Sequence, residues 1–302
     1  MDFKGVDSVE LPQAGNEKPF TKYLEYKPGK TPANFAGSAT AEQVNAGFSY
    51  YDKEAATRVQ LHNFRAIVVG QAMGAGGVTK DGARYINYYS NLVSNTKTDP
   101  IRVYMRGAST PVAQGLYQNI KADLPDGVGF KHYLIVYIPE LNECAAMEIT
   151  YGLQCCFQRV IASNATGRKV PYNRVNMFAL LDMQHQYYMF TFNGSFYKAS
   201  KEADRYESGE CYFYPQVTVK MIVDDKQLEF LDAHSEAVTK WLESERDRVA
   251  GDMMSQTASR SSQQASQASQ QAPQQASKQT PQRADDNFPD LEPLNEFADL
   301  PF

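Results

Sequence analysis

Tyrosines and basic residues alternate with apolar residues in three segments of the chain, so a strand at each segment would gather them on one face. The side chains that share a face in this way are Arg102, Tyr104 and Arg106, then Lys131, Tyr133 and Tyr137, and then Tyr212, Tyr214 and Lys220. Aromatic rings stack with bases of a single nucleic acid strand, at about 1–3 kcal/mol per base, while Lys and Arg follow its phosphates. Such faces predict a surface for single-stranded nucleic acid, or else the ordinary tyrosines of half-buried strands under a second layer.

The glycine-rich segment from Gly74 to Lys80 does not fit a phosphate-binding loop, which needs two glycines five apart followed directly by Lys-Ser or Lys-Thr. Together with Gly70 it predicts a mobile loop between two strands. Lys80 and Arg84, at the end of this loop, are candidates for contacts with the phosphates of a nucleic acid strand.

The residue types that most often carry catalysis or bind metals show no pattern that fits either role. The four histidines, which stand in no catalytic motif, are His62, His132, His185 and His234. The four cysteines are irregularly spaced and include no C-x-x-C, so we expect buried, reduced thiols. The sequence therefore predicts a protein without catalytic activity, metal or cofactor.

The last eighteen residues, DDNFPDLEPLNEFADLPF, carry six acidic residues and no basic one. Phenylalanines and leucines recur among the acids, although so charged a segment cannot bury enough apolar surface to fold alone. A tail that serves only solubility has no need of large apolar side chains. Residues 285–302 therefore predict a docking peptide for a partner protein with a basic pocket over an apolar cleft.

Composition divides the chain into four parts. Residues 1–19 predict a flexible arm, and residues 251–284, rich in Ser, Gln and Ala, predict a disordered linker. All nineteen tyrosines lie before the linker, in the domain expected at residues 20–250, and the acidic tail follows it. Residues 1–254 carry a net charge of only −2, so a polyanion site in this domain has to be a local patch.

Hydrophobic periodicity predicts the elements of this domain. Strands are expected at residues 19–26, 84–92, 101–105, 131–139, 187–192 and 212–223, with a hairpin over residues 48–69 that turns at Asp52-Lys53. Helices are expected from an N-cap at Thr110 to the turn at Pro125, at residues 153–161 and at residues 225–249. Short strands without βαβ alternation predict a β-rich α+β fold, with an OB-type antiparallel barrel decorated by these two or three helices as the leading candidate.

No run of the sequence approaches the roughly eighteen apolar residues that a membrane-spanning helix needs. The first residues have neither the basic nor the apolar region of a signal peptide. We therefore expect a cytoplasmic protein with no membrane partner.

The tip Asp299-Leu300-Pro301-Phe302, behind a Gln/Ser-rich linker and an aromatic-rich body, resembles that of single-stranded DNA-binding proteins, whose bacterial members end in Asp-Ile-Pro-Phe. The body segments FSYYDKE, YYSNLVSNTKTDPIRVY and GLYQNIK are similar to phage members of that family. The resemblance implies an OB-type fold and binding of single-stranded DNA during replication, recombination and repair in an infected bacterium. It also implies that Asp299, Leu300, Pro301 and Phe302 recruit a polymerase, helicase or nuclease, and it leaves homo-oligomerisation open.

On this interpretation the bases stack on tyrosines, expected to be Tyr104, Tyr133, Tyr137, Tyr212 and Tyr214. The phosphates contact basic residues, expected to be Lys80, Arg84, Arg102, Arg106 and Lys131. Two other functions fit the same residues: an interaction or virion structural protein that docks through its tail, and a recombination protein that anneals complementary strands. Binding of single-stranded DNA tests the first alternative, and annealing of strands tests the second.

Overall fold

The computed structural model describes residues 18–27, 30–31, 38–40, 46–150, 153, 187–198 and 211–268. The chain divides into two compact units, Met1–Val249 and Ala250–Phe302. All described strands belong to the first unit, which ends one residue before the end of the domain expected from composition. The acidic tail, with Asp299, Leu300, Pro301 and Phe302, lies outside the described residues.

The described part of the chain is dominated by one connected sheet of thirteen strands. In chain order the strands are β1 (Phe20–Lys27), β2 (Lys30–Thr31), β3 (Ser38–Thr40), β4 (Gly47–Asp52), β5 (Thr57–Leu61), β6 (Asn63–Asp81), β7 (Arg84–Ser90), β8 (Ile101–Met105), β9 (Ala113–Gly115), β10 (Val128–Ile138), β11 (Glu143–Glu148), β12 (Tyr188–Lys198) and β13 (Cys211–Met221). The helical elements are α2 (Tyr117–Ile120), the 3-10 turn η1 (Lys121–Asp123) and the long α5 (Asp225–Ala268). The fold is therefore β-rich α+β, as predicted.

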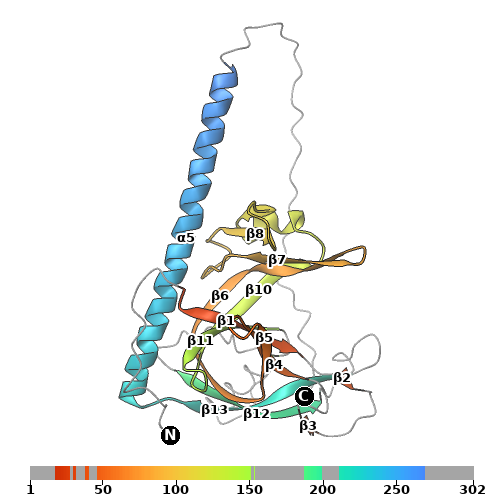
Figure 1. Cartoon of the computed structure of the whole chain (residues 1–302). Coiled ribbons are helices and arrows are strands. Elements are labelled where there is room, and N and C mark those ends of the chain that lie inside the picture. The colour runs from red at the N-terminus through yellow and green to blue at the C-terminus, as the bar shows by residue number, and fades with distance from the viewer. Residues whose placement is uncertain are drawn as a thin grey trace, which may run out of the picture. The chain divides into compact units, whose positions relative to one another are not determined.

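Strands β6 and β10 form the centre of the sheet, whose main path runs β2-β13-β12-β6-β10-β11-β1-β4-β5. They pair antiparallel from Val128 opposite Gly77 to Tyr137 opposite Ile67. Because β6 is 19 residues long, its first part also pairs with β12 and its last part pairs with β7, which leads on to β8 and β9. Figure 1 shows β6 and β10 running from the strands near β12 to β7 and β8.

The closed five-stranded barrel expected from the sequence is not formed by the described strands. Strands β2 and β5 stand at the two ends of the main path and do not pair with each other, so the sheet is open. It is also not purely antiparallel, because β1 pairs in parallel with β11, from Phe20 opposite Cys144 to Leu24 opposite Met147. The short, Ala-rich β11 carried too little β-propensity to be predicted.

Alternation along β10 sends its side chains to two different cores, as the sequence predicts. Leu134, Val136 and Ile138 pack on one face, with residues from β1, β4 and β12. Ile135 and Tyr137 pack on the other face, against α5. Both faces of the second half of β10 are thus buried. On one of these faces α5 forms a second layer over the sheet.

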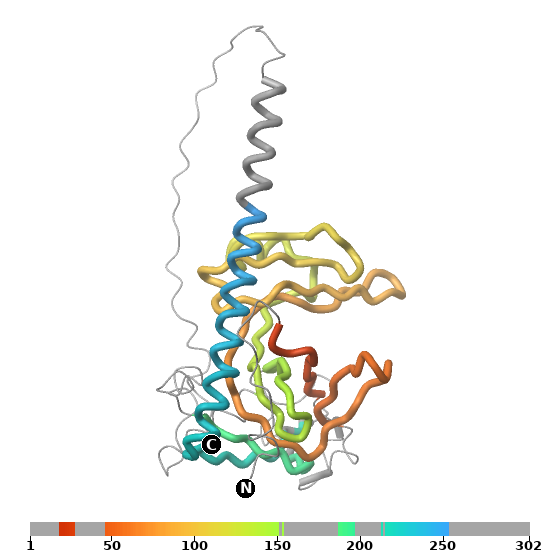
Figure 2. Tube along the Cα trace, turned by 60° about the vertical axis from the view of Figure 1, so that its left-hand side comes forward, coloured from red at the N-terminus to blue at the C-terminus, as the bar shows by residue number. Residues whose placement is uncertain are grey.

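Helix α5 begins where the sequence predicts it. The Asp224 carboxylate caps its first turn by accepting a hydrogen bond from the Gln227 backbone N–H at 3.0 Å. Leu231, Val238 and Trp241 of its apolar stripe are buried against the sheet. Figure 2 follows this part of α5, up to Val249, alongside the strands.

Three local predictions are wrong. α5 does not end near residue 249 but continues to Ala268, over the first residues of the expected linker, where Ala and Gln favour a helix. The helix expected from Thr110 is replaced by β9 and the four-residue α2, because backbone pairing of Val112 with Val103 extends the sheet there. The glycine-rich segment is not a loop but part of the continuous β6. The helix expected at residues 153–161 lies outside the described residues except for Leu153, which is helical and buried.

Close packing of α5 on β6 explains Gly70. A Cβ at this position would lie 2.8 Å from Cγ1 of Val238, closer than real Cβ contacts come. We therefore expect Gly70→Ala to destabilise the protein by about 1–3 kcal/mol in urea unfolding, as overpacked cores do. A control, Gly251→Ala, adds a carbon that meets no described atom within 4 Å and should not lower stability.

Combining Gly70→Ala with Val238→Ala removes the clash, so the double variant should lose less stability than the two single losses added together. Strict additivity, or a Gly70→Ala variant as stable as the natural protein, would contradict this packing.

Candidate nucleic-acid interface

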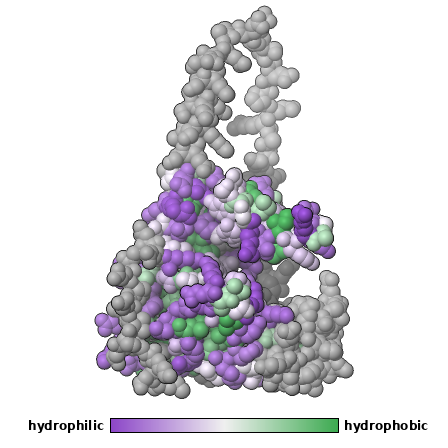
Figure 3. Space-filling model, viewed as in Figure 1, coloured by the Kyte–Doolittle hydropathy of each residue, from purple (hydrophilic) through white to green (hydrophobic). Residues whose placement is uncertain are grey.

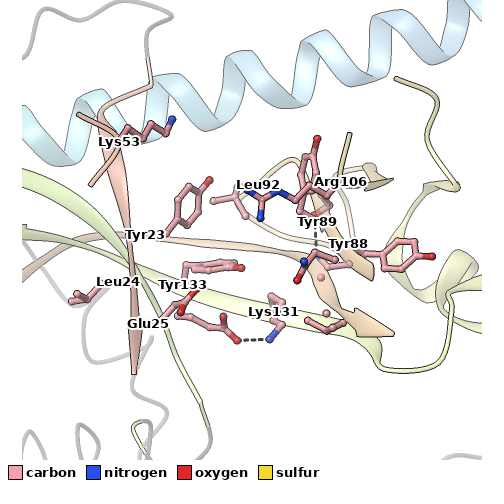
Figure 4. A pocket seen from close by; sticks show the side chains of 17 residues that line it. Tyr23, Leu24, Glu25, Lys53, Tyr88, Tyr89, Leu92, Arg106, Lys131 and Tyr133 are labelled. Carbon is pink, nitrogen blue, oxygen red and sulfur yellow. Dashed lines mark hydrogen bonds and ion pairs between the residues drawn. The ribbon is translucent and has the colours of Figure 1, made fainter. Parts of the chain in front are cut away.

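A cleft of about 660 Å³ lies between β1 on one side and β7 with β8 on the other. Four tyrosines line it, and we call it the tyrosine cleft. Its aromatic and charged lining residues are Tyr23, Tyr88, Tyr89, Tyr133, Lys53, Arg106, Lys131, Glu25 and Glu148. Figure 4 shows Tyr23, Tyr133 and Arg106 directed into the same space, whereas the ring of Tyr88 points away from it.

Pairing of β6, β7 and β8 assembles one wall of the tyrosine cleft. The Asn87 carbonyl, opposite Val78 of β6, accepts a hydrogen bond from the Arg106 N–H at 2.8 Å. Tyr89 lies opposite Tyr104, and the two rings stack with centroids 6.0 Å apart and an interplanar angle of 27°. Because directly paired residues project from the same face of a sheet, this face presents a guanidinium beside a pair of stacked tyrosines.

Tyr23 and Tyr133 form the opposite wall, with ring centroids 6.1 Å apart in an edge-to-face arrangement. The Lys18 ammonium fixes Tyr23, since it donates a hydrogen bond of 2.7 Å to the hydroxyl and lies 4.4 Å from the ring centroid. Burial raises the pKa of both phenols, with Glu148 adding to the effect at Tyr133. Both therefore stay neutral at physiological pH and offer uncharged rings for stacking.

The charges of the tyrosine cleft leave a local basic patch. The Glu148 carboxylate forms an ion pair with Lys131, marked by a dashed line in Figure 4. Glu25 forms an ion pair with Arg58 at 2.6 Å. Within the described part of the chain, Arg106 and Lys53 take part in no ion pair. These two cations are therefore available to an anion, despite the net charge of −5 on the whole chain.

The hairpin of β6 and β7 extends the same face beyond the cleft. Lys80 lies opposite Tyr85, whose side chain is 70 % exposed, on the face shared with Tyr89. Arg84 is exposed as well but lies opposite Asp81, on the other face of the hairpin. Figure 3 shows hydrophilic and hydrophobic residues side by side on this hairpin.

Half of the predicted contact residues lie on or next to this face. Arg106, Lys131 and Tyr133 line the tyrosine cleft, Tyr104 stacks on its wall, and Lys80 extends it. The side chains of Tyr212 and Tyr214 lie outside the described residues, although their backbone is in β13 as expected.

Two predicted contact residues are buried, and their assignment to an exposed face is wrong. Arg102 does share a face with Tyr104 and Arg106, but it is only 6 % exposed because α5 covers it, and its Nη2 donates to the Val249 carbonyl at 3.4 Å. Tyr137 is 1 % exposed, with its ring against Phe230 of α5. Neither side chain can reach a nucleic acid strand in this structure.

Sequence reasoning missed Tyr23, Tyr89 and Lys53. Tyr89 was within reach, because Tyr85, Asn87 and Tyr89 alternate along a strand that the sequence does predict. Tyr23 and Lys53 carry no local signal. Tyr23 enters the cleft because β1 pairs with β11, next to β10, and Lys53 enters it because β4, which it follows, pairs with β1.

Comparisons with known proteins add nothing to this geometry: no family model, no curated protein and no solved structure matches the chain. In the described residues, no helix is long and apolar enough to span a membrane. The same residues contain no group of three or more His, Cys, Asp or Glu side chains that could hold a metal ion.

His132, next to Tyr133 but on the opposite face of β10, makes stability depend on pH. Burial lowers the pKa of its imidazole from 6.5 to about 4, so between these values the unfolded chain binds a proton that the folded chain does not. Stability should therefore fall as the pH falls from about 6.5 to about 4. His132→Gln should lose less stability than the natural protein over this range, as measured by urea unfolding at several pH values. Equal losses would show that His132 does not cause the acid sensitivity.

Proposed function

We propose that this protein binds single-stranded DNA in the tyrosine cleft and protects it, without catalysing a reaction. The observation that carries the proposal is the cleft itself, where the rings of Tyr23, Tyr89 and Tyr133, from distant segments, line one space together with Arg106 and Lys53, which form no ion pair with the described residues. Proteins that hold single strands without reading their sequence combine stacking rings with cations in this way.

Each part of the cleft has a distinct task in this proposal. Tyr89 and Tyr133 supply ring faces for bases, and Arg106 and Lys53 supply charge for phosphates. Lys131, already paired with Glu148, would contribute its ammonium to the strand by exchanging partners. Binding in the tyrosine cleft requires only an open sheet with a hollow between two of its parts, so it does not depend on a closed OB barrel.

The acidic tail completes the proposal. Asp299, Leu300, Pro301 and Phe302 recruit a polymerase, helicase or nuclease to the coated strand, since an acidic, apolar peptide suits a basic pocket over an apolar cleft. The resemblance of this tip to that of single-stranded DNA-binding proteins supports the assignment.

Two substitutions separate stacking from phosphate contact. Tyr89→Leu should weaken binding of oligo(dT) about tenfold while the dependence of affinity on salt stays unchanged, because a stacking ring releases no counterions. Arg106→Gln should reduce the slope of log K against log salt by about 1. Quenching of tyrosine and tryptophan fluorescence by oligo(dT), followed over a salt series, measures both effects.

Matched controls are Tyr51→Leu and Lys121→Gln, which change exposed residues that do not line the cleft. Both should bind as the natural protein does. If the natural protein itself shows no quenching at low salt, the DNA-binding proposal fails and a protein docking through its tail fits better.

The tail should also compete with DNA for the basic patch. Deletion of residues 285–302 removes a charge of −6, so we expect higher oligo(dT) affinity at about 50 mM salt and little change at about 200 mM, where screening weakens the competition. The deletion should also abolish binding of the recruited enzyme. A variant with the six acids changed to amides should match the deletion in DNA affinity. Unchanged affinities for both DNA and enzyme would overturn the tail mechanism.

A further inference from the structure

A strip of bare backbone borders the tyrosine cleft and meets it at Gly76. Gly76 of β6, which lines the cleft, is paired with Gly129 of β10, and the next pair on the same face is Gly74 with Lys131. Paired residues project from one face of the sheet. Of these four positions, only Lys131 carries a side chain.

Most glycines of β6 are required by the fold. A Cβ at Gly77 would collide with the Gly127 carbonyl, and one at Gly74 would lie 2.6 Å from the Ser90 hydroxyl. Gly129 differs, because an added Cβ would meet no described atom within 4 Å. Its backbone is also not among those with a positive φ. Within the described structure, neither packing nor backbone conformation requires glycine at this position.

A glycine inside a strand costs stability, because it has more conformational freedom to lose on folding and no side chain to pack. Such a glycine often marks a bulge or a place where a ligand comes close to the backbone, and the pairing of β10 with β6 is regular at Gly129, without a bulge. Gly129 therefore points to something outside the chain that lies against this strip.

The neighbours of the strip indicate the chemistry of that ligand. Gly76 lies opposite Tyr89, whose ring is 50 % exposed and stacks on Tyr104. On its other side, Cγ of Lys131 lies 3.7 Å from where a Cβ of Gly76 would be. A flat ring resting on the glycines would thus have an aromatic ring at one edge and a lysine at the other. A nucleotide suits both neighbours, because its base can contact the tyrosine ring and its phosphate can contact the lysine ammonium.

We propose that Gly76 and Gly129 form a floor on which one unpaired base of the bound strand lies flat against the backbone. The inference rests on the proposed DNA binding and makes it more specific. In a duplex both faces of each base are covered by neighbouring bases, so only an unstacked base can reach the floor. The floor therefore selects single strands over duplexes.

Gly129→Val tests the floor, because valine suits a strand and places two methyl groups where the base would lie. Its affinity for oligo(dT) should fall about tenfold, the stacking contribution of one base. Affinity for an oligonucleotide of the same length without bases should stay unchanged, as should the salt slope, since no phosphate contact is removed. The melting temperature should stay equal or rise.

The matched control is Thr218→Val, which installs the same residue at an exposed position of β13 that does not line the cleft and should bind as the natural protein does. Unchanged oligo(dT) affinity of Gly129→Val would overturn the floor, and so would a lowered melting temperature, because the fold would then need this glycine. A natural protein that binds no oligo(dT) would instead overturn the proposed function, on which the floor rests.

Discussion

The antiparallel ladder between β6 and β10 is the constraint on which the rest of this structure depends. It spans from Val128 opposite Gly77 to Tyr137 opposite Ile67, and every other strand of the described sheet is connected to these two, either directly or through intervening strands. One end of the ladder belongs to the double-sided core under α5, and the other end carries β7 and β8. The tyrosine cleft exists because β6 and β10 run through both the core under α5 and the part of the sheet that carries β7 and β8.

The different fates of Tyr133 and Tyr137 show how α5 decides which side chains are available. Both project from the same face of β10, four residues apart. Tyr137 lies under α5, where its hydroxyl donates to Asn142 at 2.8 Å and burial raises its pKa to about 12. Tyr133 is only partly buried, at the edge of the same core, and lines the cleft. A single amphipathic helix thus divides one tyrosine-bearing face into a part that it buries and a part that lines the cleft.

Strand alternation was predictable from sequence wherever apolar and polar residues alternate, as in β10, and so was the apolar stripe of α5. The glycines of β6 were mistaken for a loop because local propensity does not register a helix or a neighbouring strand packed at close range. The site was predictable only in part for a related reason. Arg106, Lys131 and Tyr133 stand on strands with clear alternation, whereas Tyr23 and Lys53 reach the cleft through pairing between distant segments, which no local pattern encodes.

The parallel pairing of β1 with β11 also bears on how the protein is made. Leu24 pairs with Met147, so more than a hundred residues must leave the ribosome before the strand that carries Tyr23 finds its place. Pairings over such separations close late and slow folding, because loop entropy is lost before the contact is gained. One wall of the tyrosine cleft is therefore incomplete on the nascent chain, and the cleft forms only after its central sheet is finished.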